Sequence, residues 1–141
     1  QDQQAAMLGG VSGHAGLFST ANDLAILMQM NLQMGFYGRQ RYFLPSTVPF
    51  FAQDQSNKSH RGLGWDKRPE DGQSNYISDR VSGSSYGHSG YTGTMVWADP
   101  ERELVFVFLS NRVYPSVSNN KINALKVRRR VQEAVYEAIM E

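Results

Sequence analysis

The chain has 141 residues, of which 40% are hydrophobic and 19% charged, and its formal net charge is +1. This length suffices for one domain with a core, and the charge gives no indication of nucleic acid or an anionic membrane surface as a partner. The sequence contains no cysteine, which excludes disulfide frameworks, thiol nucleophiles and cysteine-based zinc sites. These residues contain no signal-peptide pattern, which says little about a longer parent protein, and no apolar run approaches the roughly 18 residues of a membrane span.

The first predicted helix follows a glycine-rich loop, which we expect over residues 8–18. Ser19 or Thr20 offers an N-cap oxygen, and Asp23 lies in the first turn, where a negative charge suits the helix dipole. Apolar residues then recur at helical spacing until Gly35, which is a typical stop signal. This pattern predicts an amphipathic helix over residues 20–34.

The next segment contains a second helix start and a short strand. Residues 44–53 begin with Leu-Pro-Ser-Thr, and Pro49 falls in the first turn of the predicted helix, where its missing N–H costs little. Residues 54–60 are polar, so we expect a loop. The Gly-Leu-Gly-Trp-Asp run over 62–66 predicts a short strand, whereas the Asp-, Gly- and Ser-rich stretch 67–85 shows no clear pattern.

The strongest strand signal lies after Gly90. Thr92 to Ala98 are rich in strand-forming residues, Asp99-Pro100-Glu101-Arg102 predicts a turn, and Glu103 to Asn111 predicts another strand. The run Val105 to Leu109 contains no polar residue. A strand of this kind is buried on both faces, so we expect helices on each side of the sheet.

The last segment predicts one of these helices, over roughly residues 120–140. Residues at helical spacing mark its apolar face: Ala124, Val127, Val131, Ala134, Val135 and Ala138. The run Arg128-Arg129-Arg130 spreads over about 200° of this helix. We favour a solvated face with local pairing to Glu133 over an anion-binding site.

Three patterns in the sequence could indicate a metal site or a nucleophile, but the spacing or the neighbouring residues argue against each of them. The histidines His14, His60 and His88 share no metal-ligand spacing, so the sequence predicts no metal site and no cofactor. Gly83-Ser84-Ser85-Tyr86-Gly87 matches the nucleophile elbow G-x-S-x-G, but a strand follows it and the only nearby His comes directly after it. Ser118-Asn119-Asn120-Lys121 matches S-x-x-K, but it lies in a polar loop instead of at the buried helix start that such a nucleophile needs.

The remaining candidate is the run Tyr86-Gly87-His88-Ser89-Gly90-Tyr91-Thr92-Gly93-Thr94. At the opening of a strand, a basic side chain can hold a substrate carboxylate or polarise a proton network, a hydroxyl can bind the same carboxylate, and Gly permits close approach. A strand N–H just after these residues can help form an oxyanion hole. A glycine-rich turn with an exposed His explains the segment equally well, so both interpretations stay open on this segment alone.

Read in order, the chain resembles the C-terminal part of class C β-lactamases, D,D-peptidases and related esterases. Four landmarks carry the resemblance: the helix start at 16–25, Gly-Leu-Gly-Trp at 62–65, His-Ser-Gly at 88–90, and the strand–turn–strand at 95–115 that ends in Asn and Tyr-Pro. The resemblance implies an α+β fold with an antiparallel sheet flanked by helices, the C-terminal portion of the β-lactamase/transpeptidase-like fold. Residues 1–141 would then be one incomplete domain without its N-terminal part, which agrees with a chain that does not open with Met.

The resemblance also implies roles for the motif, residue by residue. His88 would be the basic strand residue near the nucleophile. Ser89 would bind the substrate carboxylate or carbonyl, and Gly90 would keep the strand edge open. The backbone N–H of Tyr91 would be one oxyanion donor.

The resemblance implies two further site residues, and two motifs of the family are absent from the sequence. Asn111 would end the neighbouring strand and contribute to substrate binding. His14 would line the mouth of the cleft, although a loop histidine with satisfied hydrogen bonds is the favoured alternative. The family's Ser-x-x-Lys and Tyr-x-Asn motifs precede this region, so no nucleophile is expected in the chain. His88 in the place of the usual Lys favours a peptidase or esterase over a strong β-lactamase.

The implied protein is a serine hydrolase that is acylated and deacylated by a D-Ala peptide, a β-lactam or an ester, and this fragment alone would be inactive. The alternatives are a non-catalytic module that binds cell-wall fragments and a structural module that self-associates through exposed strand edges. The Gly13–Ser19 segment is similar to a subgroup found behind glycoside hydrolase family 3 β-N-acetylglucosaminidase domains, which implies an extracytoplasmic location, periplasmic or in the cell envelope. The expected partners are a peptidoglycan-derived or β-lactam substrate and the missing N-terminal part of the domain, with no nucleic acid and no membrane span.

Overall fold

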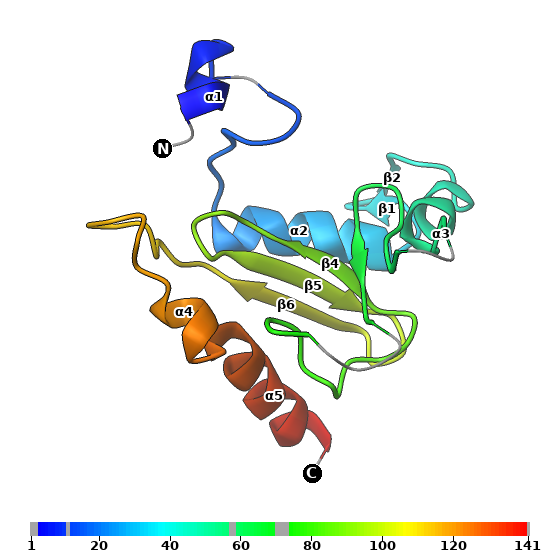
Figure 1. Cartoon of the computed structure of the whole chain (residues 1–141). Coiled ribbons are helices and arrows are strands. Elements are labelled where there is room, and N and C mark those ends of the chain that lie inside the picture. Colours follow the sequence, from blue (N-terminus) through cyan, green and yellow to red (C-terminus); the bar gives the residue numbers. More distant parts are fainter. Residues whose placement is uncertain (1–2, 11, 57–58, 70–73, 141) are drawn as a thin grey trace.

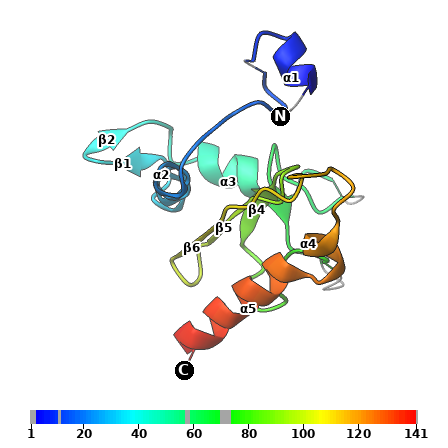
Figure 2. The same ribbon diagram turned by 90° about the vertical axis from the view of Figure 1, so that its left-hand side faces the viewer.

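The computed structural model describes residues 3–10, 12–56, 59–69 and 74–140. Its centre is a four-stranded antiparallel sheet in the order β3-β4-β5-β6. Figure 1 shows α2 along one face of this sheet and α5 along the other, and Figure 2 shows the same layers after a quarter turn. The bounds are β3 (Asp66–Lys67), β4 (Tyr86–Ser89), β5 (Met95–Asp99), β6 (Leu104–Phe108), α2 (Ala21–Leu32) and α5 (Val127–Met140). The predicted α+β fold, an antiparallel sheet flanked by helices, is confirmed.

Each face of the sheet carries its own hydrophobic cluster. On one face, Met28 of α2 packs with Val48 and Ala52 of α3 (Thr47–Ala52) and with the strand residues Tyr86 and Ala98. The cluster on the other face consists of six buried residues: Ile77, Val81, Met95, Trp97, Phe106 and Tyr136. Successive side chains of a strand point to opposite faces, so neighbours in β5 enter different clusters. The expectation of helices on both sides of the sheet is confirmed.

α2 begins and ends at the residues that the capping signals predict. The Thr20 Oγ1 accepts a hydrogen bond from the Asp23 N–H at 3.1 Å, as expected of an N-cap. At the other end, the Gly35 N–H donates to the Met30 carbonyl at 2.9 Å, while Met34 and Gly35 adopt positive φ angles of 52° and 82°. This is the pattern of a Schellman cap, which satisfies the last helical carbonyls. The helix predicted over 20–34 is confirmed.

The segment after α2 contains a hairpin and a second helix. β1 (Phe36–Tyr37) pairs with β2 (Gln40–Arg41), which the sequence did not predict. The helix predicted over 44–53 is confirmed by α3.

The strand predicted over 62–66 is wrong in its bounds. β3 contains Asp66 and Lys67, so the strand begins where the prediction ended. The Leu63 N–H donates to the Phe51 carbonyl at 2.8 Å, which means that the preceding backbone bonds to the end of α3 instead of to the sheet. The predicted loops at 8–18 and 54–60, and the patternless stretch 67–85, lie in part outside the described residues.

β4, β5 and β6 form two consecutive hairpins. Ser89 pairs with Met95 next to the first turn, and Asp99 pairs with Leu104 next to the second. The turn predicted after β5 is confirmed, and its Arg102 N–H donates to the Asp99 carbonyl at 3.3 Å. Both predicted strands are present but shorter. β5 begins at Met95 because residues 90–94 form the glycine-rich turn that was one of the two open interpretations, and β6 ends at Phe108 instead of Asn111.

The C-terminal helix is interrupted. α4 (Lys121–Ala124) and α5 replace the single helix predicted over 120–140. Lys126 has a φ of 49°, a left-handed conformation that an α-helix cannot contain. No helix within the described residues has the length and apolar character needed to cross a membrane.

The face that α5 presents to the sheet is not the predicted apolar face. Gln132 and Tyr136 are fully buried, whereas Val131 is 40% exposed. The Tyr136 hydroxyl donates to the Asp99 carboxylate at 2.7 Å, and the Gln132 Oε1 accepts from the Ser78 N–H at 2.8 Å. These hydrogen bonds have more influence on the rotation of the helix than its small Ala and Val side chains, since a buried polar group needs a partner.

The arginine run in α5 is not the solvated face that we expected. Arg128 is 8% exposed, and its guanidinium lies 5.2 Å from the centre of the Tyr76 ring. Arg129 donates to the Ser74 carbonyl at 2.9 Å and forms an ion pair with Asp79. Arginine can bury its aliphatic stem while its planar group bonds to several acceptors. The two arginines therefore attach the 74–79 segment to α5.

Candidate active-site end of the sheet

The His88-Ser89-Gly90 segment lies at the end of β4, next to the turn that leads into β5. His88 is exposed and pairs across the sheet with Val96. His88 and the buried Tyr86 alternate with Gly87, so both side chains belong to the α2 face of the sheet. The motif therefore closes a strand, which corrects the interpretation that it opens one.

A backbone carbonyl orients the His88 ring. The His88 Nδ1 lies 2.8 Å from the Ser89 carbonyl oxygen. Because a carbonyl oxygen can only accept, Nδ1 carries the proton in this contact, and Nε2 of the neutral ring keeps its lone pair. Nε2 can therefore take up a proton, and in the charged ring it can donate to an anionic group.

Two glycines shape the turn that follows the motif. The Gly90 N–H donates to the Thr94 carbonyl at 2.8 Å, and the Gly93 N–H donates to the Gly90 carbonyl at 2.9 Å. A Cβ at Gly90 would lie 2.3 Å from the Thr94 Oγ1, and Gly93 has a φ of 91°. A side chain at Gly90 would displace Thr94, and one at Gly93 would be strained. The turn thus depends on glycine at both positions.

Tyr91 offers a backbone donor in this turn. Its side chain is 59% exposed, and its carbonyl oxygen accepts a hydrogen bond from the Arg112 Nε at 2.8 Å. Its N–H donates no hydrogen bond to any described residue. A backbone N–H without an internal partner is available to a ligand oxygen. This availability fits an oxyanion donor, and the role itself stays a prediction.

Asn111 is exposed and lies beyond the end of β6. The expected pairing of the last two strands is confirmed, since β6 pairs with β5. β6 ends at Phe108 and the motif lies on β4, so the expectation that Asn111 ends the strand beside the motif is wrong. Its chain neighbours nevertheless reach the turn, because the Ser110 Oγ and the Arg112 N–H donate to the Thr92 carbonyl at 3.0 and 2.9 Å. The structure brings this segment beside the motif, and substrate binding by Asn111 stays a prediction.

His14 lies between α1 (Gln3–Met7) and α2. Figure 1 shows α1 standing apart from the sheet. The His14 Nδ1 lies 2.6 Å from the Ser12 Oγ. A loop histidine with a satisfied ring nitrogen would show this contact, and a place for His14 at the mouth of a cleft stays a prediction.

The two serine patterns rejected from the sequence do not provide a nucleophile. Ser85 of the G-x-S-x-G match is fully buried, and its Oγ donates to the Ser82 carbonyl at 2.7 Å. Ser118 of the S-x-x-K match is exposed, and its Oγ lies 2.8 Å from the Ser116 Oγ. Nucleophilic catalysis requires a serine that is both buried and activated by a base. Ser85 is buried but donates its proton to a backbone carbonyl, and Ser118 is exposed.

A buried carboxylate that the sequence analysis missed lies at the opposite end of β5. Asp99 is 0% exposed and accepts hydrogen bonds from the Ser82 N–H at 3.0 Å and the Tyr136 hydroxyl at 2.7 Å. Burial raises the pKa of Asp99, but these hydrogen bonds and the charge of Arg102 outweigh it, so that the pKa lies below its usual value. Burial and the contact with Asp99 raise the pKa of Tyr136. The hydrogen bonds of Asp99 join β5 to α5, so we infer that this carboxylate contributes to the stability of the fold.

Lys67 is a second buried charge that the sequence analysis missed. It is 9% exposed, and its Nζ donates to the Ser84 carbonyl at 3.2 Å. Burial lowers the pKa of Lys67, while the charge of Asp54 opposes this shift. Lys67 pairs with Tyr86 in the sheet, a neighbour that no local sequence pattern could indicate.

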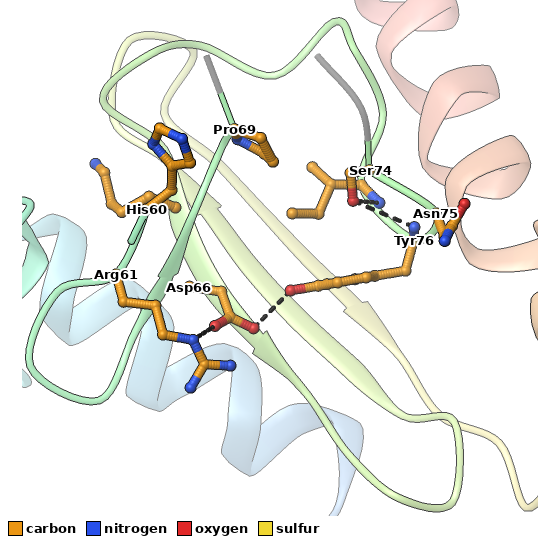
Figure 3. A pocket seen from close by; sticks show the side chains of 9 residues that line it. His60, Arg61, Asp66, Pro69, Ser74, Asn75 and Tyr76 are labelled. Atoms are coloured by element: carbon orange, nitrogen blue, oxygen red, sulfur yellow. Dashed lines mark hydrogen bonds and ion pairs between the residues drawn. The ribbon is translucent and has the colours of Figure 1, made fainter. Parts of the chain in front are cut away.

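A cavity of about 340 Å³ lies beside β3 (Figure 3). On one side of it, the Arg61 Nε lies 2.8 Å from one oxygen of the Asp66 carboxylate, and the Tyr76 hydroxyl donates to the other at 2.5 Å. Burial and the contact with Asp66 raise the pKa of Tyr76, so its hydroxyl stays protonated. Asp66 pairs with Gly87 and shares its face of the sheet, opposite to the face of His88. None of the described residues that line the cavity belongs to the predicted site.

Comparison with known proteins identifies the family. Residues 1–129 match the model of the Beta-lactamase family. Relatives from Salmonella gallinarum and Salmonella enteritidis, each named "Putative D-alanyl-D-alanine carboxypeptidase", are 40% identical to this chain over 116 residues. The match covers 82% of this chain and 27% of each relative, so the chain spans about a quarter of their length. A solved β-lactamase from Mycobacterium bovis has a TM-score of 0.64 over 85% of this chain and 44% of that one, at 21% identity.

The chain belongs to the β-lactamase family of serine hydrolases. The solved structure shows that the fold is β-lactamase-like. The resemblance drawn from the four landmarks is therefore confirmed, and the homologues with carboxypeptidase names extend it to penicillin-binding-type hydrolases.

Proposed function

We propose that this chain forms the substrate-binding end of a serine hydrolase of the D,D-peptidase or esterase type. The observation that carries the proposal is a pair of groups at the end of β4 and in the turn after it: His88 with its Nε2 lone pair, and Tyr91 with an N–H that bonds to no described residue. Such a pair can handle a proton and stabilise an oxyanion. Family membership supports the reaction class.

In the proposed reaction, a serine oxygen attacks the carbonyl carbon of a D-Ala peptide, a β-lactam or an ester. The C–N or C–O bond breaks, the leaving amine or alcohol takes up the serine proton, and water then hydrolyses the acyl-serine ester to the free acid and serine. The Tyr91 N–H donates to the oxyanion of each tetrahedral intermediate. His88 polarises the proton network or holds the substrate carboxylate, and the Ser89 hydroxyl hydrogen-bonds that carboxylate. Gly90 leaves the strand end open to the substrate, and Asn111 lies beside the same turn. His14 contributes at the mouth of the cleft.

The nucleophile of the proposed enzyme lies outside these residues. The S-x-x-K match at Ser118 is exposed, and the chain spans 27% of the length of its relatives. We place a Ser-x-x-Lys motif in an upstream part of the same domain, in an extracytoplasmic protein of peptidoglycan metabolism. The 141-residue chain alone then turns over neither nitrocefin nor simple esters.

Binding of cell-wall fragments without catalysis is the second candidate. The exposed His88 and the available Tyr91 N–H would suit a substrate carboxylate or carbonyl even if no nucleophile were present.

Self-association is favoured by a different observation. Leu17 and Phe18 are 87% and 89% exposed, and β6 lies at an edge of the described sheet.

A labelling experiment separates these candidates. The complete polypeptide that contains this chain is treated with a fluorescent penicillin and with a fluorophosphonate, beside the 141-residue chain alone. We expect label on the complete polypeptide and none on the short chain. His88→Ala should slow acylation by about 100-fold or more, the usual contribution of a proton-transfer group. His60→Ala, at an exposed histidine that lines the separate cavity, is the matched control and should be labelled like the wild type.

Stoichiometric labelling of the short chain would contradict the proposal, as would full-speed labelling of His88→Ala. An unlabelled complete polypeptide that still binds a D-Ala-D-Ala peptide would favour the binding module. Light scattering on the short chain tests self-association, and a monodisperse monomer would exclude it.

A further inference from the structure

One arginine holds the turn that follows the motif. The Arg112 Nε donates to the Tyr91 carbonyl at 2.8 Å, and the Arg112 N–H donates to the Thr92 carbonyl at 2.9 Å. The guanidinium carbon also lies 4.9 Å from the centre of the Tyr91 ring. Arg112 thus contacts two consecutive peptide units of the turn and one of its side chains.

The guanidinium of Arg112 is itself held in place. Its Nη1 lies 3.3 Å from the carbonyl oxygens of both Val117 and Asn119. The guanidinium is planar, always charged, and directs its donors at fixed angles, so bonds at one edge orient the donor at the other. The loop after β6 therefore determines where the Arg112 Nε meets Tyr91.

The turn needs such a restraint because two glycines flank it. Gly90 and Gly93 have wide conformational freedom, which leaves the residues between them without local rigidity. The peptide unit that carries the Tyr91 N–H is held by one hydrogen bond, from the Gly93 N–H to the Gly90 carbonyl. The next two peptide units are both held by Arg112, and the Ser110 Oγ adds a second donor to the Thr92 carbonyl.

We propose that Arg112 is a positioning residue, whose guanidinium holds the Tyr91 carbonyl and so keeps the Tyr91 N–H where it binds the oxyanion. Substitution of its side chain removes this bond and leaves the backbone bond from the Arg112 N–H to the Thr92 carbonyl in place. This inference rests on the proposed function and extends it to a residue outside the motif. Arg112 acts through Tyr91, without contact to the reacting atoms. Its removal should therefore lower the rate of acylation more than the affinity for the substrate.

The first test needs no activity. In the 141-residue chain, the ¹⁵N order parameter of the Tyr91 amide should be near the rigid-backbone value of about 0.85 in the wild type and below about 0.6 in Arg112→Met. Arg129→Met is the matched control, because Arg129 also holds a loop carbonyl, that of Ser74, and should leave Tyr91 rigid. If the Met variant does not fold, Arg112→Lys replaces it in this test, because Lys keeps the charge but lacks the planar guanidinium with its several donors. A Tyr91 amide that stays rigid without Arg112 would overturn the proposal.

The second test uses the complete polypeptide and an ester substrate. Arg112→Met should lower kcat by about 10- to 100-fold, less than the loss of an entire oxyanion donor, and change KM by less than about threefold. An ester with sulfur in place of its carbonyl oxygen accepts hydrogen bonds poorly. The preference of the enzyme for the oxygen ester should therefore shrink in Arg112→Met and persist in Arg129→Met.

Equal losses of kcat in Arg112→Met and Arg129→Met, with an unchanged preference for the oxygen ester, would show that Arg112 has only a structural role and would overturn the proposal. A wild-type polypeptide that no ester or penicillin acylates would contradict the proposed function. In that case the order parameter of the Tyr91 amide still decides whether Arg112 positions it.

Discussion

The two ends of β5 are built in opposite ways. At one end, both oxygens of the buried Asp99 carboxylate accept hydrogen bonds, one from the Glu101 N–H and the other from the Ser82 N–H and the Tyr136 hydroxyl. At the other end, Tyr91 in the turn beside the motif is 59% exposed, and its N–H has no partner among the described residues. A satisfied, buried polar group contributes to stability, whereas an unsatisfied, exposed one is available to a ligand. Substitutions at the two ends should therefore affect different measurements.

The largest effect on stability is expected at the buried end. Asp99→Ala removes the shared acceptor and leaves the Ser82 N–H and the Tyr136 hydroxyl buried without a partner. We expect the free energy of unfolding to fall by about 3–5 kcal/mol in urea denaturation. Asp79→Ala, which removes a partly exposed carboxylate beside Arg129, is the control and should cost less than about 1 kcal/mol. Equal losses in the two variants would contradict the assignment of the buried Asp99 carboxylate to stability.

The same carboxylate predicts how stability depends on pH. Hydrogen bonds and the charge of Arg102 outweigh the effect of burial, so the pKa of Asp99 in the folded chain lies below its ordinary value of 3.8. Asp99 therefore contributes stability that is complete above this value and is lost as the pH falls through the lower, folded-state pKa. Acid unfolding should be steeper for the wild type than for Asp99→Asn, which has no carboxylate to protonate. Parallel acid profiles would exclude Asp99 as the cause.

A smaller loss is expected in the turn. Gly93→Ala places a side chain at a φ of 91°, with its Cβ 2.6 Å from the Ser110 Oγ and 2.8 Å from the Ile122 Cδ1. We expect about 1–3 kcal/mol of destabilisation in urea. Gly83→Ala is the matched control, because its Cβ would meet nothing within 4 Å, and should stay within about 0.5 kcal/mol. A Gly93→Ala chain as stable as Gly83→Ala would show that the turn tolerates rearrangement.

The smallest effect on stability is expected at His88. Its side chain is exposed and bonds to the carbonyl of the adjacent residue, so His88→Ala should change the free energy of unfolding by less than about 0.5 kcal/mol. The same variant should lose acylation in the complete polypeptide. A large loss of stability would assign His88 to the fold and weaken the proposed separation of the two ends.

Elements with local signals were predictable from the sequence. Thr20 caps α2 through the Asp23 N–H only three residues away, and Gly35 closes the helix through a contact five residues back. The turn between β5 and β6 was likewise visible in Asp99 to Arg102. The position of the candidate site followed from the His88 motif taken in order with the other landmarks, and the family comparison confirmed that resemblance.

Features that depend on distant partners were not predictable. The face of α5 depends on Gln132 and Tyr136, which bond to Ser78 and Asp99, 54 and 37 residues away in the chain. Helical periodicity, which reads only apolar spacing, selected Val131 instead. The contact of Arg112 with Tyr91 spans 21 residues and joins two loops that carry no periodic pattern.

The sequence by itself determined which segments form α2, α3 and the last two strands, and which family the chain resembles, because caps, turns and motif order are encoded by neighbouring residues. Only the tertiary structure decided that His88 closes its strand, that Asn111 lies beyond β6 rather than beside β4, and that α5 buries Gln132 and Tyr136. The reason is physical: a buried polar group takes whichever partner the fold brings within hydrogen-bond distance, and that partner leaves no signal in the local sequence.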